Sequence, residues 1–317
     1  MKARKRNAPK HTLVELLIIS IIIMAEANSG IKYNILNKPR SALDLAAELQ
    51  RCILKIKASC MSEDGSGVDY FKLCESDLYI DYQAKTRELN SIDLRPLTSD
   101  QRKAFFINIY NALTIHALAA QPELPSTVLE VQDFWKTSSY TIAGQVYSLD
   151  DIEHGILRKN KPHPSTKKSC FQDNDPRLPY MVDILDARIH FALNCGAESC
   201  PPISVYTEQN LERALQMASR NYLNQEVTVD TDSKQINLPS LLKWYGSDAA
   251  ETDVDVVRWT IPFLEEGKAA QVQELITLKD SGSKVTIGYR PYSWKINSIQ
   301  IGEESVSGES KEKCSKM

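Results

Sequence analysis

The chain has 317 residues, and its 38 Lys and Arg against 41 Asp and Glu give a formal net charge of -3. A balance this even excludes the basic footprint of a nucleic-acid-binding protein. With 42% hydrophobic and 25% charged residues, the composition is that of a globular chain, which excludes disordered, collagen-like and polytopic membrane proteins. We therefore expect neither a nucleic-acid partner nor a stable membrane span.

Residues 1–27 are typical of an export signal. Basic residues precede the apolar run 13–25, which is shorter than the ~20 residues that cross a bilayer, and the run is followed by an Ala-x-Ala cleavage pattern. Glu15 inside the run and the absence of an Asn-x-Ser/Thr glycosylation acceptor count against export. We predict a signal peptide at 1–27 and a linker at 28–40, hence a protein of the secretory pathway or the extracellular space. The alternative is a cytoplasmic protein whose first residues form an amphipathic helix.

Residues 41–300 are predicted to form one α+β domain that is mostly helical and carries a small antiparallel sheet. Apolar residues at helical spacing follow the Ser41 cap as far as residue 60. Alternating patterns around turn residues predict two hairpins and a last strand, at 140–147, 227–238 and 284–290. Helical patterns fall at 240–245, 251–265 and 268–277. Residues 301–317 are predicted to be a disordered charged tail.

The strongest predicted helix covers residues 99–120. Thr98 and Gln101 form a capping box before it, and apolar residues occupy every side of the helix, so it should be buried. Asn108, Asn111 and His116 lie within this run. Each must find hydrogen-bond partners in the interior, because a buried polar group without one costs about 1–3 kcal/mol.

The chemically richest segment, residues 186–203, follows a predicted helix, 148–158, that contains His154. It places His190 and Asn194 on one side of a strand or helix, and then a loop with Cys195 and Cys200 that ends in two prolines. The chain has seven cysteines, an odd number at no regular spacing, so a complete disulfide framework is excluded.

Three interpretations of this loop compete. In the first, a cysteine is a nucleophile whose thiolate is favoured by an imidazole, as in thiol hydrolases and acyl transferases. The candidates are Cys200 first and Cys195 second as nucleophile, His154 or His190 as base, with His116 equally eligible from its helix, and Asn111 or Asn194 as the residue that orients the ring.

In the second interpretation, His190, Cys195 and Cys200 bind a metal, but the segment lacks the paired C-x2-C knuckles of structural zinc sites and a fourth ligand. In the third, the cysteines are small buried hydrophobic residues or a local disulfide, and the histidines are satisfied core donors. No phosphate-binding, dinucleotide or zinc-protease motif occurs in the sequence, so we expect no cofactor and no metal.

Several segments together resemble the family catalogued as domain of unknown function 547. The matching stretches are 68–70, 104–113, 148–158, 188–202 and 292–297, so the likeness spans about residues 41–300. It implies that Asn108, Asn111, His154, His190, Cys195 and Cys200 belong to family motifs, with Glu153 and Arg158 beside them. It implies no activity, because the family name records none. Where the family leads us to expect an acidic residue before the last Trp, this chain has Ser293.

The sequence thus predicts a pocket bounded by the 148–158 helix and the 190–202 loop, supported by the central helix. The predicted activity is thiol-dependent hydrolysis or acyl transfer on a small-molecule or peptide substrate. The alternative is a non-catalytic module that binds a protein partner, in which the same Cys and His residues are structural.

Overall fold

The computed structural model describes residues 41–299, a mostly helical α+β domain with two small sheets. The α-helices of at least four residues in the described part of the chain are α2 (Ala42–Cys60), α3 (Tyr70–Glu75), α4 (Asp77–Thr86), α5 (Ser99–Ala119), α6 (Phe134–Thr137), α7 (Leu211–Glu226), α8 (Ser240–Tyr245), α9 (Asp253–Thr260) and α10 (Glu266–Asp280). Two 3-10 helices, η1 (Arg87–Ser91) and η5 (Ala187–Phe191), and one π-helix, η3 (Asp151–Leu157), have five to seven residues. Three-residue turns are η2 (Val128–Glu130), η4 (Leu178–Tyr180), η6 (Gly246–Asp248) and η7 (Ile261–Phe263).

The predicted signal peptide, linker and charged tail lie outside the described residues. Within residues 41–299, no helix combines the length and the apolar character needed to cross a membrane.

Within residues 41–299, five strands form two sheets. β1 (Ser139–Ile142) and β2 (Gln145–Ser148) make the predicted first hairpin, with Ala143 and Gly144 in the left-handed conformation that a two-residue turn requires, at φ 51° and 76°. β3 (Thr228–Asp230) and β4 (Gln235–Leu238) make the second, also antiparallel. β5 (Thr286–Tyr289) differs from the prediction because it pairs parallel with β4. The chain returns to the sheet through α9 and α10, and such a crossover connection brings a strand back in the same direction.

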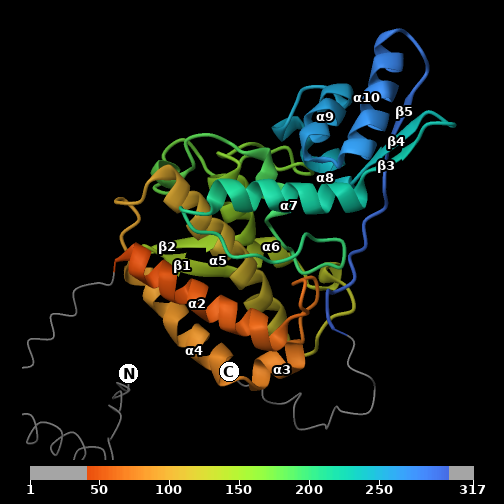
Figure 1. Ribbon diagram of the computed structural model, residues 1–317. Helices are drawn as coiled ribbons and strands as arrows, with labels where there is room; N and C mark the ends of the chain where they lie inside the picture. The colour runs from red at the N-terminus through yellow and green to blue at the C-terminus, as the bar shows by residue number, and fades with distance from the viewer. Residues whose placement is uncertain (1–40, 300–317) are drawn as a thin grey trace, which may run out of the picture. The chain divides into compact units, whose positions relative to one another are not determined.

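The core consists of two hydrophobic clusters that meet at η5. One gathers side chains of α2 to α5 and of the segment up to the start of α7, and the other gathers those of α7 to α10 with the second sheet. Figure 1 shows α7 between these two groups of elements. Within η5, Ile189 belongs to the first cluster and Phe191 to the second, so His190 between them lies where the clusters join.

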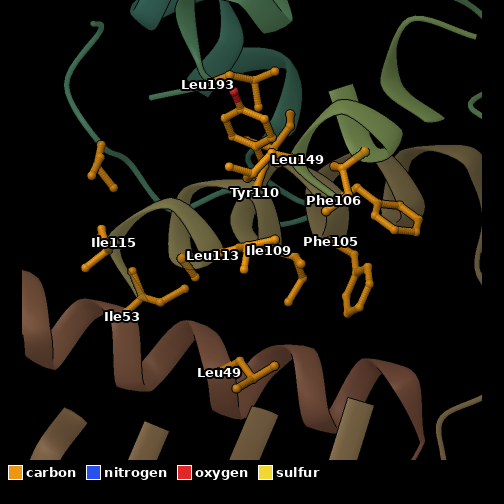
Figure 2. Close-up of a cluster of buried hydrophobic side chains, with 14 of the residues drawn as sticks. Leu49, Ile53, Phe105, Phe106, Ile109, Tyr110, Leu113, Ile115, Leu149 and Leu193 are labelled. Atoms are coloured by element: carbon orange, nitrogen blue, oxygen red, sulfur yellow. The ribbon is translucent and has the colours of Figure 1, made fainter. Parts of the chain in front are cut away.

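Helix α5 is the central buried helix that the sequence predicts. Its capping box between Thr98 and Gln101 is present, and the residues from 104 to 115 are all buried. Figure 2 shows its two sides: Leu49 of α2 faces one side, while Tyr110 points away from α2, to the side where Leu193 lies. The hydroxyl of a buried tyrosine usually has a hydrogen-bond partner. We therefore expect buried polar side chains on this second side of α5.

The predicted helix after β2 forms a π-turn, η3, in place of an α-helix. Its start is capped as expected, because the Ser148 hydroxyl accepts from the Asp151 amide at 3.1 Å and the Asp151 carboxylate accepts from the Ser148 amide at 3.0 Å. At its end, the Arg158 amide donates five residues back, to the Glu153 carbonyl at 2.8 Å. Gly155 lies against the Phe171 ring so closely that a Cβ would be 2.3 Å from Cζ. Wide turns of this kind are frequent at functional sites.

Candidate functional site

Two asparagines of α5 fix the backbone on either side of the cysteine loop, which we define as residues 194–202. The Asn111 amide donates to the Ala192 carbonyl at 2.9 Å and its oxygen accepts from the Asn194 amide at 2.8 Å. Asn108 makes the same paired contact with both backbone groups of Tyr206, at 2.6 and 2.9 Å. The partners predicted for these buried amides are therefore backbone groups, and the loop is anchored to α5 before and after the two cysteines.

Asn194 closes the cysteine loop from within. Its Nδ2 donates to the Pro201 carbonyl at 2.7 Å, and its Oδ1 accepts from the Gly196 amide at 2.8 Å. Gly196 has a φ of +88°, and a Cβ there would lie 2.4 Å from Cδ1 of Leu118. Glycine is therefore required at this position both by the backbone conformation and by the lack of space.

The two sulfurs of the loop are hydrogen-bond partners. Sγ of Cys195 lies 2.8 Å from Sγ of Cys200, which also accepts from the Cys195 amide at 3.1 Å. The Tyr292 hydroxyl is 3.1 Å from the Cys200 sulfur and 3.5 Å from that of Cys195. In the described residues, no imidazole is hydrogen-bonded to either sulfur.

These contacts separate the pKa values of the two thiols. Burial raises the pKa of Cys200, but the hydrogen bonds from Cys195, Tyr292 and the backbone outweigh it, so the pKa lies below its ordinary value. The hydrogen bond to Cys200, together with burial, raises the pKa of Cys195 well above its ordinary value. Of the two sulfurs, Cys200 is thus the one whose thiolate is favoured, and Cys195 the one whose protonated form is favoured.

We expect Tyr292→Phe to raise the pKa of Cys200, because it removes one donor to the thiolate. A hydrogen bond to a charged group contributes about 1.5 kcal/mol or more, so alkylation of Cys200 by iodoacetamide near neutral pH should slow about tenfold. Rates measured by peptide mapping against pH test this. Tyr289→Phe is the matched control, since the Tyr289 hydroxyl contacts Asp253. Equal rates in the two variants would contradict the assignment.

A second group of polar side chains surrounds Asp248, whose side chain is 0% exposed. Its carboxylate accepts from Nε and Nη2 of Arg158 at 2.6 and 3.0 Å, from Nε2 of His190 at 2.9 Å and from Nζ of Lys161 at 3.0 Å. Burial raises the pKa of Asp248, but the hydrogen bonds and charges of His190 and Arg158 outweigh it and hold the pKa far below its usual range. Asp248 is therefore an ionised carboxylate in the interior.

His190 is oriented by this carboxylate. Because an ionised carboxylate only accepts, Nε2 of His190 carries a proton in the hydrogen bond to Asp248, and in the neutral ring the lone pair is on Nδ1. No hydrogen bond to Nδ1 exists within residues 41–299. The ring stacks on Tyr245 with centroids 4.0 Å apart and an interplanar angle of 13°. The Asp–His pair thus has the form of the base and its orienting acid in a catalytic triad.

In His154, unlike His190, the ring nitrogen that carries the lone pair already has a hydrogen-bond partner. Its Nδ1 lies 3.0 Å from Nη1 of Arg158, and since a guanidinium only donates, this nitrogen is an acceptor whose lone pair is already engaged. Burial lowers the pKa of His154 to about 4, so the ring is neutral near pH 7. Of the two histidines that the sequence proposes as base, His190 is the one whose free nitrogen can accept a proton.

His116 lies in another part of the structure. Its Nδ1 is 2.7 Å from the Tyr140 hydroxyl and its Nε2 is 3.3 Å from Nε2 of Gln83. Burial lowers its pKa to about 4. The imidazole has found the hydrogen-bond partners that its buried position requires, and these partners belong to α4 and β1.

Glu153 interacts with the histidines near Asp248 and also with Tyr110 and Tyr245. Its Oε2 accepts from the Tyr110 hydroxyl at 3.0 Å. Burial raises the pKa of Glu153, but the charges of the histidines beside it and the hydrogen bonds from Tyr245 and Tyr110 bring it below the ordinary value. Burial, and then the negative charge of Glu153, raises the pKa of both tyrosines well above 10.0. Tyr110 and Tyr245 are therefore within electrostatic reach of Glu153.

Asp150, His154 and His163 present ligand atoms within 4.8 Å of one another, a spacing compatible with a metal ion. The protonation of the rings opposes metal binding. His163 accepts from the amides of Ser165 and Thr166 through Nδ1, at 3.1 and 3.3 Å, and His154 accepts from Arg158 through Nδ1, so the other nitrogen of each neutral ring carries a proton. We assign no metal to this group.

The second interpretation of the cysteine segment, metal binding by His190, Cys195 and Cys200, finds no geometric support. In residues 41–299 the ligand atoms of these three side chains do not gather within 4.8 Å of one another.

A cavity of about 630 Å³ borders Asp248. It lies at the start of α5, between Lys103 and Arg188 and the aromatic side chains of Trp259 and Phe263, and neither sulfur of the cysteine loop lines it. The pocket that the sequence predicts, between the 148–158 helix and the 190–202 loop, is a different location. The cavity instead lies beside the residue that orients His190, although the Asp248 carboxylate itself stays buried.

Asp248, Tyr245, Tyr110 and Tyr292 were not among the site residues predicted from the sequence. Asp248 lies in a short polar turn after α8, and nothing in its neighbourhood indicates a buried ion pair. Tyr110 and Tyr292 are different, because they lie in two of the stretches that carry the family resemblance, 104–113 and 292–297, and that was the available signal.

In the comparison with known proteins, a family model matches part of the chain. A family model described as "Protein of unknown function, DUF547" matches residues 94–223. This stretch contains Asn108, Asn111, Glu153, His154, Arg158, His190, Cys195 and Cys200, and it confirms the predicted resemblance over a shorter range than the sequence motifs suggest. Comparisons with curated proteins and with solved structures found no match.

Proposed function

We propose that this chain, whose residues 94–223 belong to the family described as protein of unknown function DUF547, is a thiol-dependent hydrolase or acyl transferase with Cys200 as its nucleophile. One observation carries the proposal: the Cys195 thiol, the Cys195 amide and the Tyr292 hydroxyl, all groups able to donate, converge on Sγ of Cys200 at 2.8, 3.1 and 3.1 Å. A thiolate is the reactive form of cysteine, and hydrogen bonds to the charged form favour it.

In the first half of the reaction, the Cys200 thiolate attacks the carbonyl carbon of an acyl substrate and forms a thioester. The leaving group departs with a proton, and Cys195 is suited to supply it because its thiol remains protonated beside the reacting sulfur. No base has to deprotonate Cys200 first, which agrees with the absence of an imidazole among the hydrogen-bond partners of the sulfurs in residues 41–299.

In the second half, water or another acceptor attacks the thioester, and this step needs a general base. His190 fits the role because Asp248 holds its protonated Nε2 at 2.9 Å and leaves Nδ1 to accept a proton. A water molecule between Nδ1 and the thioester is required, since the ring does not contact the sulfurs. The group that orients the base is then a carboxylate, Asp248, where the sequence suggests an asparagine.

Asn111 and Asn194 keep a role in this proposal, but as positioning residues. Asn111 fixes the start of the cysteine loop to α5, and Asn194 closes the loop around Cys195 and Cys200. They hold the nucleophile in place, and their hydrogen bonds go to backbone groups of the loop.

An activated ester tests the proposal. We expect p-nitrophenyl acetate to release nitrophenolate in a burst and to leave one acetyl group on Cys200, located by mass spectrometry of peptides. Cys170→Ser should behave like the wild type, because burial raises the pKa of the Cys170 thiol to about 12 and it reacts poorly. Cys200→Ser should show no burst. An unacylated Cys200 in the native protein would favour the non-catalytic module, in which the cysteines and histidines are structural.

A further inference from the structure

The thiol pair supports a second kind of chemistry. We propose that Cys195 and Cys200 are a redox modification site, at which a hydroperoxide converts the two thiols into an intramolecular disulfide. The observation behind this is the 2.8 Å contact between the two sulfurs inside a loop that is anchored on both sides. The inference does not rest on acyl transfer, because it needs only the position and the reactivity of the sulfurs.

The geometry requires little movement. A disulfide bond is about 2.05 Å long, so the two sulfurs must approach by less than ~1 Å. The loop backbone is already closed, since Asn194 joins the Pro201 carbonyl to the Gly196 amide across it. The hydrogen bonds of Asn194 do not involve the sulfurs, so they can persist in both redox states.

The pair also has the unequal reactivity that stepwise oxidation needs. Cys200 accepts hydrogen bonds from Tyr292 and from the Cys195 amide, which stabilise a thiolate, while the Cys195 thiol points at that sulfur and is placed to react second. The other free thiols of residues 41–299 have oxygen partners; Cys170, for example, contacts the Asp150 carbonyl at 3.5 Å. In the described part of the chain, only the loop brings two sulfurs into contact.

The oxidation takes place in two steps, first to a sulfenic acid on Cys200 and then to the disulfide. The Cys200 thiolate attacks one oxygen of the hydroperoxide, the O–O bond breaks, and an alcohol or water leaves with a proton, so Cys200 becomes a sulfenic acid. The Cys195 sulfur then attacks the Cys200 sulfur, the S–O bond breaks, and hydroxide leaves with the Cys195 proton as water. Two thiols lose two electrons in total, and the hydroperoxide gains them.

Burial decides the class of oxidant. Cys200 is 7% exposed and Cys195 is half-buried, so a small hydroperoxide can reach the pair more easily than a bulky disulfide can align with it. The disulfide would remove the thiolate of Cys200, and a thiol reductant would restore it.

The test uses the reduced full-length chain treated with hydrogen peroxide, followed by alkylation and peptide mapping. We expect Cys195 and Cys200 to lose alkylation together, to appear as one linked peptide, and to recover with dithiothreitol. In Cys195→Ser, oxidation should stop at a sulfenic acid on Cys200 that dimedone traps. Cys170→Ser is the matched control and should form the linked peptide like the wild type.

Two results would overturn the proposal: Cys195 and Cys200 both remaining alkylatable after peroxide, or wild-type Cys200 accumulating sulfinic acid without a linked peptide. Either result is distinguishable from a failure of the acyl-transfer proposal, because acetylation of Cys200 is measured separately on the reduced protein.

Discussion

Replacing Asp248 with asparagine should lower the free energy of unfolding by about 3–5 kcal/mol. The carboxylate is fully buried and is the shared partner of Arg158, Lys161 and His190. An amide cannot neutralise the Arg158 guanidinium, which would stay in the interior as an unpaired charge. Equilibrium unfolding in urea, followed by circular dichroism, measures the change.

Asp255→Asn is the matched control, because Asp255 pairs with Arg258 on the surface, where both side chains are well exposed. Loss of such a pair costs about 0–1 kcal/mol. If the two substitutions lower the stability equally, Asp248 is not the centre of the buried polar group.

The same carboxylate implies a pH dependence of stability. The pKa of Asp248 is lower in the folded chain than in the unfolded chain, so its contribution is fully present above the unfolded value of about 3.9. As the pH falls below that value the unfolded chain takes up the proton first, and the contribution is progressively lost.

His190→Asn should slow hydrolysis of the acetylated protein about a hundredfold or more, the usual contribution of a general base. An asparagine can still donate to Asp248, so the hydrogen bond that orients position 190 is retained while the accepting nitrogen is removed. Acetylation of Cys200 itself should remain fast, because the thiolate is stabilised by other groups. A burst of nitrophenolate followed by a much slower steady state is the expected time course.

His154→Asn is the comparison variant, since Nδ1 of His154 is already engaged by Arg158 and its ring is neutral near pH 7. We expect a steady-state rate within a few-fold of the wild type at a temperature where both variants are folded. A slower steady state in His154→Asn than in His190→Asn would exchange the roles of the two histidines.

Local patterns in the sequence were sufficient to predict the supporting helix. The capping box before α5 and the apolar residues on all its sides gave its start, its length and its burial. The requirement that buried amides be satisfied also predicted that Asn108 and Asn111 would have partners, although it could not say that these would be backbone groups flanking the cysteine loop. The capping box and the apolar pattern of α5 depend on residues only a few positions apart in the sequence.

The arrangement of the site depends on distant residues, and the sequence could not supply it. Asp248 and His190 are 58 positions apart, and the polar turn that contains Asp248 carries no pattern that marks it as buried. The π-turn of η3 was also outside prediction, and the close approach of its Gly155 to the Phe171 ring joins residues that lie outside any local pattern. The same holds for β5, whose parallel pairing follows from the crossover through α10.

The most direct test of the central claim, that Cys200 is held as a thiolate, is the rate of its alkylation by iodoacetamide as a function of pH, measured in the Cys170→Ser background. We expect Cys200 to react with an apparent pKa below that of a free cysteine, about 8.5, and Tyr292→Phe to move this pKa upward. An apparent pKa above that of free cysteine, or no alkylation of Cys200 in the native protein, would contradict it.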